Sequence, residues 1–125
     1  MRKPNPTAVA VVANLFFATH LATVAKSIGV TLEIVRPDQA PERCREARPA
    51  LVLVDLESAP DIASVIARVK AEIAADGGRL VGIYPHVRDD LREAGIGAGL
   101  DQAIPRSAVQ KLLPGLLRSA SATMS

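Results

Sequence analysis

Asp55 is the side chain with the clearest potential for chemistry, because it closes the apolar run PALVLVDLES, residues 49–58. A carboxylate offers acceptor oxygens and a negative charge, so a strand that stops on an acid places that charge where it meets another group. The role of such an acid is either chemical, in a reaction or binding site, or architectural, as a helix-cap or loop acid. The elements around Asp55 decide between the two.

The other residue types that carry chemistry do not form a recognisable site. His20 and His86 are the only histidines, and neither has the spacing of a zinc-binding pair. Cys44 is the only cysteine, which excludes an intrachain disulfide and a thiolate cluster. Its helical neighbours Ala40 and Ala47 indicate a small buried hydrophobe. Because no nucleophile–base pair is visible either, the sequence predicts a protein without enzymatic activity.

Strand and helix patterns alternate along the whole chain. The β-prone runs are TAVAVVA (7–13), VTLEIV (30–35), ALVLVD (50–55), RLVGIY (79–84) and DQAI (101–104). Helical patterns follow each of them, over residues 14–29, 38–47, 58–76, 87–94 and from 107 onward. Asp38 is positioned to cap the second helix, Ser58 and Asp61 have capping-box spacing, and Pro114 is expected to kink or end the last helix.

Five strand–helix units in one short chain predict a single α/β domain with a doubly wound parallel sheet of order 2-1-3-4-5, a flavodoxin-like three-layer α/β/α architecture. We place the core at about residues 8–117, a flexible N-terminal arm at 1–6 and a flexible tail at 118–125. In open sheets of this kind ligands bind beyond the carboxyl ends of the strands, where the strand order reverses. Asp55 lies at that point together with Ala13 and Asn14.

Bulk composition narrows the function classes. The 125 residues have 49% hydrophobic and only 2% aromatic content, with a formal net charge of +2. Basic residues are spread out and stacking aromatics are scarce, so we expect no nucleic-acid partner. No signal peptide or sufficiently long apolar segment is visible, so we expect no membrane association and a cytoplasmic location.

The chain resembles the receiver domains of bacterial two-component response regulators from about Val9 to Leu117. The resemblance rests on the order of the elements, the length, the acid that ends the third strand, and the Arg106–Ser107 turn after the fifth. It implies that Asp55 is equivalent to the residue that accepts a phosphoryl group. It also implies an acidic pair after the first strand that holds Mg²⁺. Two further pocket positions are implied, a Thr or Ser at the end of the fourth strand and a Lys after the fifth.

Position by position, the chain departs from that pattern around Asp55. The acidic pair is replaced by Ala13 and Asn14, the hydroxyl position falls on Tyr84, and the lysine position falls on Arg106. We expect the Tyr84 ring to take the space that phosphoryl oxygens need, and Arg106 to pair bidentately with Asp55. Without two carboxylates the site offers Mg²⁺ little more than water does. We therefore interpret the pocket as degenerate, with no metal and no other cofactor.

Two further features concern switching and partners. The aromatic that takes part in receiver switching is replaced by Ala103, so Tyr84 and Ala103 are not expected to form a two-state switch. Phe16 and His20 lie on the helical face opposite the apolar stripe. Phe16 either covers a loop or anchors a protein partner, and in receivers the first helix is where phosphodonor proteins dock.

Three hypotheses for function follow. The first is a pseudo-receiver that acts in signalling by binding a protein partner or a second copy of itself, through the first helix or through the face of the fourth helix, fifth strand and fifth helix. The second is an atypical receiver that is still phosphorylated on Asp55 by a histidine kinase or small phosphodonor, with Mg²⁺. The third is a small-ligand binder at the switch-point crevice, for a nucleotide or flavin, although a glycine-rich first turn is missing.

Overall fold

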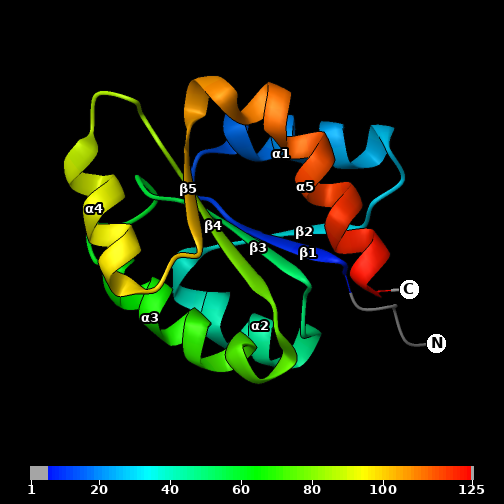
Figure 1. The fold of residues 1–125 in the computed structure, drawn as a ribbon, viewed down its shortest axis with the longest axis horizontal. Coiled ribbons are helices and arrows are strands. Elements are labelled where there is room, and N and C mark those ends of the chain that lie inside the picture. The colour runs from blue at the N-terminus through cyan, green and yellow to red at the C-terminus, as the bar shows by residue number, and fades with distance from the viewer. Residues whose placement is uncertain (1–5, 125) are drawn as a thin grey trace.

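In a computed structural model, which describes residues 6–124, strands and helices alternate as the sequence predicts (Figure 1). The strands are β1 (Ala8–Val11), β2 (Leu32–Val35), β3 (Leu51–Asp55), β4 (Arg79–Tyr84) and β5 (Gln102–Pro105). The helices are α1 (Leu15–Ser27), α2 (Ala40–Ala47), α3 (Ile62–Ile73), α4 (Asp89–Ala98) and α5 (Val109–Met124). Short 3₁₀ turns precede α2, follow α3 and precede α5.

The sheet is parallel throughout, and its order β2-β1-β3-β4-β5 confirms the predicted flavodoxin-like fold. Helices α1 and α5 cover one face and α2, α3 and α4 cover the other (Figure 1). The central strands are apolar on both faces because both are covered: Leu51 and Leu53 of β3 pack towards α1 and α5, whereas Val52 and Val54 pack towards α2 and α3. None of the helices within residues 6–124 combines the length and the hydropathy needed to cross a membrane.

Strand register places the chemistry-bearing residues at one edge. Val11, the last residue of β1, pairs with Val54, and Asp55 pairs with Ile83 of β4. Asp55 therefore extends one residue beyond the end of β1, at the carboxyl edge of the sheet. That edge is the switch point between β1 and β3, where the two crossovers leave in opposite directions.

Several helix ends differ from the predicted ones. Asp61 precedes α3 without a side-chain capping bond, and Ser58 contacts β1 instead, so the predicted capping box does not form. Asp38 lies inside the 3₁₀ turn before α2 and does not cap that helix. Among α1 to α4, whose first residues are all described, α1 is the helix that has a side-chain N-cap, from Asn14.

Helix α5 is longer than predicted. It continues through Pro114 to Met124, where we expected an end or a kink followed by a flexible tail from residue 118. Leu117 and Ala120 are buried against the α1 face of the core, and this burial outweighs the backbone hydrogen bond that proline cannot donate. Of the predicted N-terminal arm, residues 1–5 lie outside the described residues, and Pro6 is buried.

Cys44 is buried between α2 and the sheet with Ala40 and Ala47, as its helical spacing predicts. Burial raises the pKa of its thiol from 9.0 to about 12. The folded protein thus holds the thiol proton more tightly than the unfolded chain does. The resulting stability is complete below the unfolded pKa of about 9 and is lost as pH rises towards 12.

We predict that the advantage of wild type over Cys44→Ala in free energy of unfolding shrinks above about pH 9, by up to about 1.4 kcal/mol for each pH unit. Urea unfolding of both proteins at a series of pH values measures this difference. Other titrating groups cancel because the two proteins share them. A difference that stays constant up to about pH 11 would contradict the prediction.

Candidate functional site

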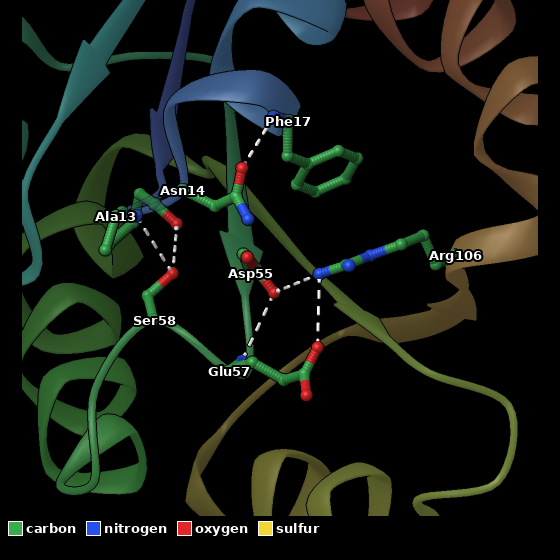
Figure 2. Close-up of polar contacts among 8 residues, drawn as sticks. Ala13, Asn14, Phe17, Asp55, Glu57, Ser58 and Arg106 are labelled. Atoms are coloured by element: carbon green, nitrogen blue, oxygen red, sulfur yellow. Dashed lines mark hydrogen bonds and ion pairs between the residues drawn. The ribbon is translucent and has the colours of Figure 1, made fainter.

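A pocket of about 420 Å³ opens at the carboxyl edge of the sheet, above the end of β3. The loops after β1, β3 and β5 supply its lining, and Figure 2 shows Asn14, Glu57 and Arg106 around the Asp55 carboxylate. The lining residues are Ala13, Asn14, Asp55, Glu57, Ser58 and Arg106. Three segments that are far apart in sequence thus meet where parallel strands end.

Asp55 is the one acidic or basic residue among the described residues that is buried, with 2% of its surface exposed. Its Oδ1 oxygen accepts hydrogen bonds from the backbone N–H of Glu57 at 3.2 Å and from Nη2 of Arg106 at 3.1 Å. Its Oδ2 oxygen accepts no hydrogen bond from residues 6–124 (Figure 2). One half of the carboxylate is therefore paired, and the other half opens on the pocket.

Arg106 pairs with two carboxylates through a single nitrogen. Its Nη2 lies 3.1 Å from Oδ1 of Asp55 and 3.3 Å from Oε1 of Glu57. The guanidinium also stacks on the Phe17 ring of α1, with its Cζ 4.6 Å from the ring centroid. The predicted bidentate pair with Asp55 is therefore wrong, because Glu57 shares the nitrogen and the ring fixes the plane of the guanidinium.

Asn14 presents a donor to the pocket. Its Oδ1 accepts the backbone N–H of Phe17 at 3.0 Å, which caps α1. Figure 2 shows the amide nitrogen of Asn14 on the opposite side, turned towards Asp55. The predicted role of the Asn14 position as a pocket residue holds, but the oxygen that a cation would need is already occupied by the helix cap.

Ser58 ties the loop after β3 to the end of β1. Its Oγ accepts the backbone N–H of Ala13 at 3.3 Å and donates to the carbonyl of Val11 at 3.4 Å. Ser58 thus links the β3–α3 loop to the end of β1 beyond Val11 and Val54, the last residues that pair between the two strands. It therefore holds the floor of the pocket in place without offering a free hydroxyl.

Tyr84 lies outside this pocket. It ends β4 and is buried, with 9% exposure, in the apolar cluster that α2, α3 and α4 cover. Ala103 of β5 packs against the same cluster. The expectation that the Tyr84 ring fills the space above Asp55 is therefore wrong, since strand alternation turns it to the other face of the sheet.

Apolar surface lies beside the pocket at the start of α1. Leu15 and Phe16 are 81% and 91% exposed, and both follow Asn14 directly in the chain. His20, one turn further along, is also exposed. The exposure of Phe16 and His20 agrees with their predicted position on the outer face of α1.

Sequence reasoning missed Glu57, Ser58 and Phe17 as site residues. Glu57 stands two residues after Asp55, and that proximity was the available signal for a second carboxylate. Ser58 was assigned to a capping box, and Phe17 to the core stripe of α1, where it also packs. The contact of the Phe17 ring with the Arg106 guanidinium could not be predicted, because it depends on how far α1 lies from the turn between β5 and α5.

Comparison with known proteins supports the fold through structure alone. No protein-family model matches the sequence, and no curated protein sequence matches it. Among solved structures, a putative response regulator from Chloroflexus aurantiacus is 16% identical with a TM-score of 0.78, over 95% of this chain and 99% of that one. The fold is that of receiver domains.

Two further similar structures come from proteins of different kinds. The receiver domain of a sensor histidine kinase from Pseudomonas aeruginosa, solved with a magnesium ion in its active-site cleft, is 18% identical with a TM-score of 0.74, over 91% of this chain and 98% of that one. A putative pilus assembly-related protein from Burkholderia pseudomallei is 14% identical with a TM-score of 0.70, over 98% and 95%. At these identities the likeness concerns architecture, and function depends on the site.

Proposed function

We propose that this chain is a pseudo-receiver, a signalling module that acts by binding other proteins without magnesium-dependent phosphorylation of Asp55 and without enzymatic turnover. The observation that carries the proposal is the position of Arg106, whose Nη2 bridges Asp55 and Glu57. The protein's own cation pairs with the carboxylate that would otherwise react. A paired and half-buried guanidinium takes the place of a metal.

The residues present do not fit a magnesium ion. Mg²⁺ needs six oxygens in near-octahedral geometry and is usually bound through carboxylates. Within residues 6–124 no group of three or more His, Cys, Asp or Glu side chains could hold a metal ion. The two carboxylates at hand already pair with Arg106, and the Asn14 oxygen caps α1. Charge neutralisation of a transferring phosphoryl group therefore lacks its usual source.

Exposed apolar side chains support the binding role. Leu15 and Phe16 project at the start of α1, and Ile96 of α4 and Leu112 of α5 are 43% and 38% exposed. The first pair lies beside the pocket, and the second lies on the face of α4, β5 and α5. Tyr84 is already buried and Ala103 is small, which supports a face that does not switch between two states.

One observation favours phosphorylation of Asp55 as a second candidate function. The pocket is open and large enough for a phosphoryl group, and its donors, Asn14 and Arg106, are of the kind that bind phosphoryl oxygens. In that case Arg106 would leave Glu57 to contact the phosphoryl oxygens.

We predict that the intact mass of the protein is unchanged after incubation with acetyl phosphate and Mg²⁺. The reason is that the ion pair with Arg106 draws charge from the whole Asp55 carboxylate, which makes Oδ2 a weaker nucleophile, and that the site lacks the oxygen ligands for a metal that would assist the transfer. Mass spectrometry of the intact protein measures the outcome, with Asp55→Asn as the matched control and a magnesium-binding receiver as the positive control. A phosphoryl adduct that needs Mg²⁺ and disappears in Asp55→Asn would establish the second candidate instead.

A further inference from the structure

The pocket above Asp55 holds more negative charge than its own cation neutralises. Its charged lining residues are two carboxylates, Asp55 and Glu57, and one guanidinium, Arg106, which gives a net charge of −1. Water screens part of the Glu57 charge, because Glu57 is 40% exposed, whereas Asp55 is 2% exposed and shares the single positive charge of Arg106 with Glu57. The pocket therefore favours a positively charged occupant.

The same carboxylate leaves an acceptor unused. Asp55 is buried, and its Oδ2 oxygen faces the pocket without a donor from the described residues. Oδ2 is not among the buried side-chain atoms that lack a partner, so it is open to water in the pocket. A charge-assisted hydrogen bond is the strongest one that it can accept from an occupant that displaces this water. An occupant with a positive charge and an N–H donor would both balance the negative charge of the pocket and donate a hydrogen bond to Oδ2 of Asp55.

The rim of the pocket indicates that this occupant belongs to a protein. Asn14 lines the pocket, and the next two residues are the exposed Leu15 and Phe16. Phe16 is one of only two phenylalanines in the chain, and 91% of its surface is exposed. An inorganic or small organic cation would leave Leu15 and Phe16 exposed to water, whereas a polypeptide can pack an apolar side chain against them.

We propose that the pocket receives a lysine or arginine side chain of a partner protein, with an apolar residue beside it packed on Leu15 and Phe16. The inference rests on the proposed binding function and names the chemistry of the partner. The incoming ammonium or guanidinium donates to Oδ2 of Asp55, while Arg106 keeps Oδ1. A cavity of about 420 Å³ accommodates one such side chain.

The test is selection of random peptides on the immobilised 125-residue chain, followed by fluorescence polarisation with the selected peptide. We expect selected peptides to carry a lysine or arginine next to an aromatic or aliphatic residue. Replacing that basic residue with glutamine in the peptide should weaken binding more than about tenfold, and so should Asp55→Asn in the protein. Phe16→Ala should weaken binding to a similar extent, whereas Val87→Ala, which removes another exposed apolar side chain from the loop between β4 and α4, should leave it unchanged.

The peptide substitution leaves the protein intact, so its result does not depend on the folding of any variant. Selection of peptides without a basic residue, no selection at all, or equal affinity for Asp55→Asn would overturn the inference. Self-association of the wild type that Phe16→Ala abolishes would overturn it in favour of a second copy as the occupant. Failure of the proposed function is a separate result, because it appears as a phosphoryl adduct on Asp55.

Discussion

Arg106→Met is expected to lower the free energy of unfolding by about 2 kcal/mol at neutral pH. The substitution keeps the apolar contact with Phe17 but leaves the buried Asp55 carboxylate without its cation. Breaking a fully buried ion pair costs about 3–5 kcal/mol, and the 39% exposure of the Arg106 side chain reduces that figure. Urea unfolding of the two proteins at low salt measures the difference.

A double-mutant cycle separates the ion pair from the other contacts of Arg106. Asp55→Asn removes the charge, so Arg106→Met should cost about 1 kcal/mol or less in that background. Arg88→Met is the matched control, because Arg88 forms an exposed pair with Asp90 and its loss should change stability by less than about 0.5 kcal/mol. Equal costs of Arg106→Met with and without the Asp55 charge would show that the Arg106–Asp55 ion pair does not contribute to stability.

The layout of the fold was predictable because it depends on patterns that repeat along the chain. Continuous apolar strands between amphipathic helices require a parallel sheet covered on both faces, and short connections limit the possible strand orders. The position of Asp55 followed from that layout alone, since the carboxyl end of β3 lies at the switch point. Helix ends were less predictable, as Ser58 and Pro114 illustrate, because tertiary contacts override local capping and breaking signals.

The details of the site could not be read from the sequence, because they depend on which atoms face each other. The presence of Asn14 does not reveal that its oxygen caps α1 and its nitrogen faces the pocket. The pairing of Arg106 with Asp55 was expected, but the sharing of one nitrogen with Glu57 depends on the path of the β3–α3 loop. Tyr84 shows the same point, since a one-residue step along β4 changes the face of the sheet.

Leu100→Ala is expected to cost about 3 kcal/mol in free energy of unfolding, because it empties a buried site between β4 and α4. Leu100 is 6% exposed and fits between two glycines, Gly82 of β4 and Gly95 of α4. Gly95 is the one buried residue of α4, so this contact sets how closely α4 approaches the sheet. It thereby positions the α4 side of the α4–β5–α5 face, the second candidate surface for a partner.

Gly82→Ala tests the same contact from the other side. A Cβ at Gly82 would lie 2.5 Å from Cδ1 of Leu100 and 3.2 Å from Cδ2 of Leu56, so Leu100 would have to move. We expect a cost of about 2 kcal/mol from this overpacking in the wild type. In the Leu100→Ala background only the 3.2 Å contact with Leu56 remains, so the same change should cost less than about 1 kcal/mol. Part of that cost is offset because alanine loses less backbone entropy than glycine on folding. Calorimetry or urea unfolding of the four proteins measures the difference. If the two costs simply add, Leu100 does not hold α4 on the sheet, and the α4–β5–α5 face would have to be positioned by other contacts.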